Sequence, residues 1–205
     1  MASVSLNHIY KVYSGNVTAV SDFCLDIEDK EFIVLVGPSG CGKSTFMRLV
    51  VRLDKPTEGE IIFQGKNLTN LKGEELRQTR QHIQMVFQDP YSSLDPRKTA
   101  GKLIEEPLIV HKLISDKNER EKRVLELMRE VGLDIQHVHR FPHEFSGGQR
   151  QRINVARALA MNPKVIVCDE PVSALDVSIQ AQVLNLFNRL QQQYNLTYIF
   201  ISHDL

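Results

Sequence analysis

The sequence of 205 residues has no surplus charge of either sign, few cysteines and no long apolar run. Its 25 basic residues balance 25 acidic ones, which argues against a strongly basic, nucleic-acid-binding domain. The three cysteines, Cys24, Cys41 and Cys168, are too few and too scattered for a disulfide framework, so we expect reduced thiols in a cytosolic chain. Apolar runs such as 32–36 are far shorter than the roughly 20 residues that span a bilayer. Any membrane role is therefore expected to depend on partner chains.

The composition is that of an ordinary globular chain, with 42% hydrophobic and 24% charged residues. Intrinsic disorder and coiled coil are disfavoured by this mix. No signal peptide, internal repeat or low-complexity linker is evident. A chain of this length buries roughly 70% of its unfolded surface, so a single large domain can form a core without disulfides.

The apolar pattern along the chain alternates between strands and helices. We expect strands at 17–27, 31–36, 60–63, 83–87, 165–168 and 196–201, and helices at 43–53, 99–133, 148–161 and 178–194. The continuous apolar runs at 31–36 and 165–168 predict strands that are buried on both faces. Glu106-Pro107 is interpreted as a helix boundary. Strands alternating with helices, interrupted by an all-helical insert, predict an α/β core with a helical subdomain.

Residues 37–44 match the phosphate-binding pattern G-x-x-x-x-G-K-[ST] and are called the phosphate loop below. Its glycines let several backbone N–H groups face a phosphate, and the helix that follows presents its positive end to the same anion. Lys43 supplies a cation for the β- and γ-phosphates, and the Ser44 hydroxyl is a ligand for Mg²⁺. The alternative is a glycine-rich turn that matches by chance, which its place between a strand and a helix disfavours. The residues of the loop are Gly37, Pro38, Ser39, Gly40, Cys41, Gly42, Lys43 and Ser44.

Two further motifs follow. Asp169 and Glu170 end a buried strand, at the sheet edge where ligands bind in open α/β folds. Asp169 can hold Mg²⁺ and Glu170 can polarise an attacking water, although solvated acids capping a strand are the simpler alternative. Residues 146–149, called the signature segment below, are Ser146, Gly147, Gly148 and Gln149, and place a glycine pair at a helix start. Alone, this segment is typical of an ordinary N-cap at Ser146.

The three motifs stand in the order typical of ATP-binding cassette ATPases, and the chain resembles an ABC transporter nucleotide-binding subunit over essentially its whole length. The resemblance implies one domain, 1–205, with a P-loop NTPase core and mixed sheet at 1–90 and 160–205. It implies an inserted helical subdomain at about 91–159 that carries the signature segment. Family members usually continue beyond Leu205, so the C-terminal end is expected to be shortened.

The same resemblance implies roles for residues that their local pattern would leave as surface polar groups. Gln88 would contact Mg²⁺ and the attacking water, and His203 the γ-phosphate. Asp176 would lie in a loop communicating across a dimer interface, and the signature segment would grip the γ-phosphate bound to the opposite subunit. Tyr13 would stack on adenine, with Tyr10 the second choice. The implied catalytic set is Lys43, Gln88, Glu170 and His203, the metal set is Ser44, Gln88 and Asp169, and the nucleotide set is Tyr13, Gly37, Pro38, Ser39, Gly40, Cys41, Gly42, Lys43, Ser44, Thr45, Gln88, Ser146, Gly147, Gly148, Gln149, Asp169 and Asp176.

The implied function is an importer ATPase that uses ATP and Mg²⁺. It would work as a homodimer, or as a heterodimer with a related ATPase, on membrane permease subunits at the cytoplasmic face. A solute-binding protein would be an indirect partner, and no nucleic acid is expected. Residues 1–45 resemble sugar-importer ATPases, whereas Tyr91–Arg97 and Phe141–Phe145 resemble oligopeptide and dipeptide importers, which we favour.

Two alternatives from other classes are less favoured. A soluble ABC ATPase of DNA repair or translation would carry long coiled coils, zinc modules or a second cassette, which this sequence lacks. A regulatory module that binds nucleotide without hydrolysing it would not need Glu170 and His203. The histidines at 137, 139 and 143 are interpreted as part of a polar connector and not as a metal site.

Overall fold

The computed structural model describes residues 3–38 and 40–202, and the chain forms two compact units. The first unit comprises residues 1–85, 164–170 and 191–205, and the second comprises 86–163 and 171–190. His203 and Ser39, both expected in the site, lie outside the described residues. No helix within the described part of the chain is long and apolar enough to cross a bilayer.

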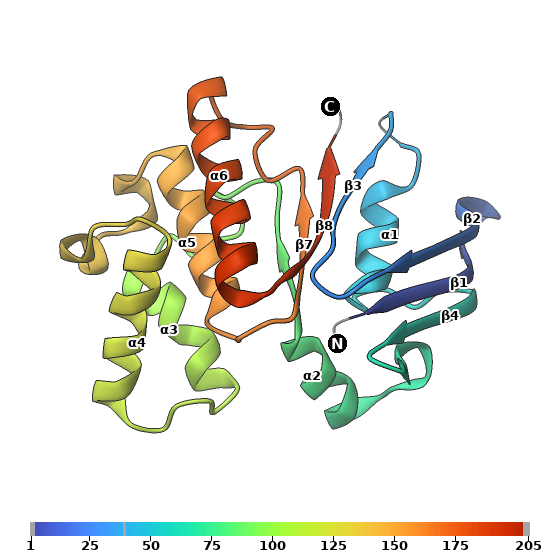
Figure 1. The fold of residues 1–205 in the computed structure, drawn as a ribbon, viewed down its shortest axis with the longest axis horizontal. Helices are drawn as coiled ribbons and strands as arrows, with labels where there is room; N and C mark the ends of the chain where they lie inside the picture. The colour runs from blue at the N-terminus through green and yellow to red at the C-terminus, as the bar shows by residue number, and fades with distance from the viewer. Residues whose placement is uncertain (1–2, 39, 203–205) are drawn as a thin grey trace. The chain divides into compact units, whose positions relative to one another are not determined.

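The first unit contains two four-stranded sheets (Figure 1). An antiparallel sheet has the order β2-β1-β4-β5, and the sheet that carries the phosphate loop has the order β3-β8-β7-β6, with β3 and β7 each parallel to β8. The elements are β1 (Val4–Tyr13), β2 (Val17–Ile27), β3 (Phe32–Val36), α1 (Lys43–Val50), β4 (Glu58–Phe63), β5 (Lys66–Asn67), a 3₁₀ turn (Leu68–Asn70), α2 (Gly73–Gln81), β6 (Ile83–Val86), β7 (Val165–Asp169) and β8 (Thr197–Ser202).

One hydrophobic core joins the two sheets through α1. Phe46, Met47, Leu49 and Val50 of this helix are buried in a single cluster with residues of β1, β4, β7 and β8. Their spacing places them on one face of the helix, which is why residues after the phosphate loop fold as a helix against the strands. The core thereby fixes the helix whose first turn adjoins the loop.

The buried-strand prediction is confirmed for β7 and wrong for β3. Residues 165–168 are fully buried. In β3, Val34 and Val36 are each 44% exposed. The reason is position: β3 lies at one edge of its sheet, whereas β7 has a neighbouring strand on both sides.

The second unit is mainly helical. The expected helical stretch at 99–133 is two helices, α3 (Ala100–Val110) and α4 (Lys117–Glu130), followed by α5 (Gly147–Leu159) and α6 (Val177–Tyr194), with 3₁₀ turns at Ile135–His139 and Pro142–Glu144. The side chains of Thr99, Asp116 and Ser146 accept hydrogen bonds from backbone N–H groups and cap α3, α4 and α5. Pro107 lies inside α3, so the predicted boundary there is wrong. It occupies the last turn, where the helix loses only one backbone hydrogen bond.

Candidate functional site

The phosphate loop connects the end of β3 to the start of α1. Gly40 and Gly42 have φ angles of +82° and +94°, a conformation that favours glycine. A Cβ on Gly42 would lie 2.2 Å from the carbonyl oxygen of Ala19, so no other residue fits there without a backbone shift. No side chain caps α1, whose N-cap is Gly42 itself. The first N–H groups of the helix can therefore donate to an anion.

Lys43 lies over its own loop. Its Nζ donates hydrogen bonds to the carbonyl oxygens of Gly37 and, at 2.9 Å, Pro38, and lies 3.8 Å from the Sγ of Cys41. The ammonium is thus held within the loop by neutral carbonyl groups, which a phosphate oxygen can replace with a charge-assisted partner. Ser44 is exposed and Thr45 half-buried at the start of α1.

The carboxylates come to the same sheet edge as the phosphate loop. Val36 pairs with Ser202, and Asp169 pairs with Ile201, so the carboxyl ends of β3, β7 and β8 lie together. Burial raises the pKa of Asp169 above its ordinary value and the charge of Glu170 raises it further, while Lys43 lowers it. The positive charge of Lys43 therefore acts on the Asp169 carboxylate. A carboxylate at this position offers the oxygen ligands that a hard cation such as Mg²⁺ prefers.

Glu170 has an unusual backbone conformation. Its φ is +42°, in the left-handed region that a residue with a side chain rarely adopts. Its N–H donates to the carbonyl oxygen of Ile201 at 3.1 Å, which ties the residue to β8. Such conformations cost of order 1–3 kcal/mol and cluster at functional sites. The chain thus turns sharply after β7 and fixes where the Glu170 side chain begins.

Tyr13 ends β1 and is 39% exposed, whereas Tyr10 is half-buried within the strand. The Tyr13 hydroxyl donates to Asp54 at 3.2 Å, and Lys11 Nζ lies 5.0 Å from the ring centroid. Arg48 bonds the same carboxylate at 2.8 Å and holds the pKa of Asp54 below its usual value. The ring is anchored at its hydroxyl, which suits a stacking platform.

In the second unit, the structure brings Gln88 to the loop before α6. The Nε2 of Gln88 donates to the hydroxyl of Ser173 at 3.4 Å. Asp176, at the end of that loop, accepts backbone hydrogen bonds from Ile179 and Gln180 through its carbonyl oxygen and so starts α6. Two predicted residues that are 88 positions apart in the chain therefore belong to one local structure.

The signature segment forms the N-terminal end of α5. Ser146 and Gln149 form a reciprocal capping box: the Ser146 N–H donates to Gln149 Oε1 at 3.0 Å, and the Gln149 N–H donates to Ser146 Oγ at 3.3 Å. A Cβ on Gly147 would lie 3.1 Å from Leu175, and one on Gly148 would lie 2.4 Å from Ile179. The N-cap interpretation of Ser146 is confirmed, and the two glycines pack against the start of α6 and the loop before it.

Sequence reasoning missed three polar residues of α5 that hold the chain after Gln88. Arg150 lies over the ring of Tyr91, and Asn154 and Arg157 both bond Ser93. They are spaced four and then three residues apart, which places them on one face of the helix. This spacing is the sequence feature that could have identified them as a group. Nothing in the sequence indicates their partners.

Comparison with known proteins places the chain among ATP-binding cassettes. A family model described as ABC transporter matches residues 20–173. The oligopeptide transport ATP-binding protein AppF of Bacillus subtilis is 55% identical over 93% of this chain and 58% of its own length. The dipeptide transport ATP-binding protein DppF of Escherichia coli K12 is 50% identical over 100% of this chain and 63% of its own length. The chain thus spans about three fifths of the length of these relatives.

Solved structures of ATP-binding cassettes have the same fold as this chain. A dimeric ATP-binding cassette in a post-hydrolysis state, bound to ADP and Pi, is 35% identical with a TM-score of 0.88, over 98% of this chain and 88% of that one. The cbiO1 protein of Clostridium perfringens, described as part of an ABC transporter complex, is 26% identical with a TM-score of 0.89, over 98% of this chain and 78% of that one. The predicted α/β fold class with a P-loop core is confirmed, as is the resemblance to peptide-importer ATP-binding subunits.

Proposed function

This chain belongs to the ABC transporter family, and we propose that it is the ATP-binding and ATP-hydrolysing subunit of an importer of oligopeptides or dipeptides. The observation that carries the proposal is the sheet edge of the first unit. There β3, which leads into the phosphate loop, and β7, which ends in Asp169, both pair with β8, and the charge of Lys43 lowers the pKa of the Asp169 carboxylate. The names of the relatives, which are oligopeptide and dipeptide transport proteins, support the cargo.

The residues present fit a nucleotide with Mg²⁺. The uncapped start of α1 and the glycine backbone would hold phosphate oxygens, with Lys43 as the cation, and Tyr13 would stack on the base. Mg²⁺, when bound, neutralises phosphate charge, and the hydroxyl of Ser44 and the carboxylate of Asp169 are the oxygen ligands it prefers.

Family resemblance adds the remaining roles to the proposal. Glu170 would act as general base on the attacking water, and its pinned backbone supports that role. Gln88 would be a further Mg²⁺ ligand and contact the water, and His203 would contact the γ-phosphate. The signature segment and Asp176 would act on the nucleotide bound to an opposite subunit.

The proposed assembly is a homodimer, or a heterodimer with a related ATPase, docked on membrane permease subunits at the cytoplasmic face. Two structural neighbours, one described as a dimer and one as part of an ABC transporter complex, support both kinds of contact. A solute-binding protein would be an indirect partner. The segment Tyr91–Arg97 would face the permease, and 91–159 would be the helical subdomain.

The proposal is tested by separating binding from hydrolysis in the full-length protein. Lys43→Ala should weaken ATP binding roughly 10- to 100-fold, because it removes a charge-assisted hydrogen bond worth about 1.5–3 kcal/mol. Glu170→Gln should bind ATP normally and lose about 10²- to 10⁴-fold in turnover, because the amide cannot accept the proton of water.

Calorimetric titration and phosphate release measure the two quantities. Lys66→Ala is the matched control, since it removes the same charge from an exposed position on β5 of the same unit. Unchanged ATP affinity in Lys43→Ala, or equal loss of affinity in both lysine variants, would refute the site.

A further inference from the structure

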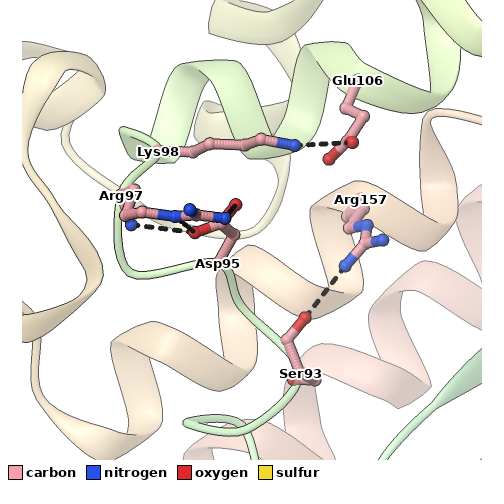
Figure 2. A network of polar contacts seen from close by, with 6 residues as sticks. All are labelled: Ser93, Asp95, Arg97, Lys98, Glu106 and Arg157. Atoms are coloured by element: carbon pink, nitrogen blue, oxygen red, sulfur yellow. Dashed lines mark hydrogen bonds and ion pairs between the residues drawn. The ribbon is translucent and has the colours of Figure 1, made fainter.

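The chain just after Gln88 is fastened to α5 at Ser93. Asn154 Nδ2 donates to the Ser93 hydroxyl at 2.8 Å, and an NH group of Arg157 donates to the Ser93 carbonyl oxygen at 3.0 Å. Figure 2 shows the Arg157 guanidinium directed at this carbonyl group. Asn154 is only 7% exposed. Because one of the two bonds holds the backbone, this clamp fixes the path of the chain and not merely a side chain.

A second link joins Tyr91, the first residue of the segment Tyr91–Arg97, to the residues that precede the signature segment. The Arg150 guanidinium lies 5.4 Å from the ring centroid of Tyr91, within the range of a cation–π contact. The same guanidinium donates to the carbonyl oxygen of Phe145 at 2.6 Å and to that of Pro142 at 3.4 Å. Arg150 therefore connects Tyr91 to the turn that leads into α5.

The far end of the segment is tied to α3, and one of its side chains faces outward. Lys98 Nζ bonds Glu106 Oε1 of α3 at 2.7 Å, and Arg97 bonds Asp95 within the segment (Figure 2). Leu94, which follows the clamped Ser93, is 2% exposed, whereas the Arg97 side chain is 88% exposed. The segment is thus held from beneath and presents its outer side to solvent.

Helix α5 offers a rigid path from this clamp to the signature segment. Asn154 and Arg157 lie eight and eleven residues beyond Ser146, which at about 1.5 Å per residue is roughly 12–16 Å along the helix axis. The helix is buried along much of its length and capped at Ser146. A displacement imposed at Ser93 must therefore either break the clamp or move helix α5, which begins after its N-cap Ser146.

We propose that Asn154 and Arg157 are positioning residues that couple the segment Tyr91–Arg97 to the signature segment, so that a permease pressing on the former moves the latter. The inference rests on the proposed function, because it assigns the segment to permease docking. Both hydrogen bonds of the clamp join residues of the second unit. Loss of the clamp should therefore reduce the peptide-stimulated ATP turnover and leave the basal turnover nearly unchanged.

The test compares Arg157→Met and Asn154→Leu with the unmodified full-length protein. Each is captured with its permease subunits from native membranes and reconstituted in proteoliposomes with the solute-binding protein. Trialanine is the transport probe. Each variant should lose at least fivefold of its peptide-stimulated ATP turnover, while basal turnover of the purified subunit stays within twofold. Arg157→Lys, which keeps a donor for the Ser93 carbonyl, should restore most of the stimulation.

Arg152→Met is the matched control, because Arg152 lies on the same helix and donates at 2.7 Å to the carbonyl oxygen of Val131, outside the segment. It should leave stimulation intact. Equal loss in Arg152→Met and Arg157→Met, or full stimulation in Arg157→Met, overturns the inference alone. If a variant does not fold, Ser93→Ala removes only the hydroxyl acceptor, and its full stimulation overturns the role of Asn154. Absence of stimulation in the unmodified protein overturns the proposed function and this inference with it.

Discussion

Replacing Gly148 by alanine is expected to destabilise the protein despite the better helix propensity of alanine. Gly148 is the second residue of α5, and a Cβ there would lie 2.4 Å from the Cγ2 atom of Ile179 and 3.8 Å from its Cβ. Ile179 is β-branched and lies in α6, where its χ1 has one strongly preferred rotamer. Neither helix can absorb this overlap by a simple side-chain rotation.

Two opposing magnitudes decide the sign of the effect. Overpacking a well-packed site costs about 1–3 kcal/mol, whereas alanine gains at most about 1 kcal/mol over glycine in a helix. A net loss of about 1–2 kcal/mol would lower the melting temperature by roughly 2–8 °C in a chain of this size. Gly147→Ala is the control: its Cβ would meet Leu175 at 3.1 Å, but through the terminal methyl group of a flexible side chain. We expect that variant to stay within about 0.5 kcal/mol of the unmodified protein.

Urea unfolding followed by circular dichroism measures the difference. The double variant Gly148→Ala with Ile179→Ala should be more stable than the sum of the two single changes predicts, because each removes the reason for the other's penalty. An unchanged midpoint for Gly148→Ala, or strict additivity in the double variant, would show that these helices do not pack as described.

Three shorter predictions concern Gln151, the Asp169 carboxyl group and two of the cysteines. Gln151→Met should raise the free energy of unfolding by about 1 kcal/mol, because neither side-chain polar atom of buried Gln151 has a hydrogen-bond partner among the described residues; urea unfolding checks it. Lys43→Met should raise the pKa of Asp169 further, since Lys43 opposes the upward effect of burial and Glu170. Because that pKa lies above the unfolded value, the contribution of the group to stability is lost as pH rises through it, and carbon NMR titration reports the shift. Exposed Cys41 should react with a maleimide and be protected by Mg-ATP, whereas buried Cys168, whose thiol pKa burial raises, should react only after unfolding; mass spectrometry distinguishes them.

The parts of the site that sequence could predict are those in which structure and chemistry are local. The phosphate loop is a continuous pattern between a strand and a helix, and Asp169 follows directly on a fully buried apolar strand. Parallel strands bring their carboxyl ends together, so the sequence alone places the two motifs at one edge of the sheet, as the strand pairing has them. In contrast, the partners of Asn154 and Arg157 lie 61 and 64 residues away, and no pattern joins them.

Strand β1 and helix α2 escaped prediction because their residues carry no clean periodic pattern. In β1, the pairing with β2 shifts register between Leu6 and Ile9, and His8 between them has a φ of +49°. This irregularity breaks the alternation that identifies a strand. Helix α2 has no buried residue, so it lacks the apolar stripe that identifies an amphipathic helix.

The capping role of Ser146 in the signature segment is compatible with the ligand role proposed for it. The Ser146 hydroxyl accepts the N–H of Gln149, which uses one lone pair of its oxygen. A serine hydroxyl also carries an O–H donor, and that donor is the group that a phosphate oxygen needs. Capping therefore does not compete with phosphate binding but fixes the direction of the Cβ–Oγ bond in advance. Gly147 and Gly148 pack against Leu175 and Ile179, which fixes the position of the first turn of α5. The first N–H groups of this turn have no acceptor within the helix. What the sequence alone presents as an ordinary helix start is thus, for the same physical reason, suited to hold an anion.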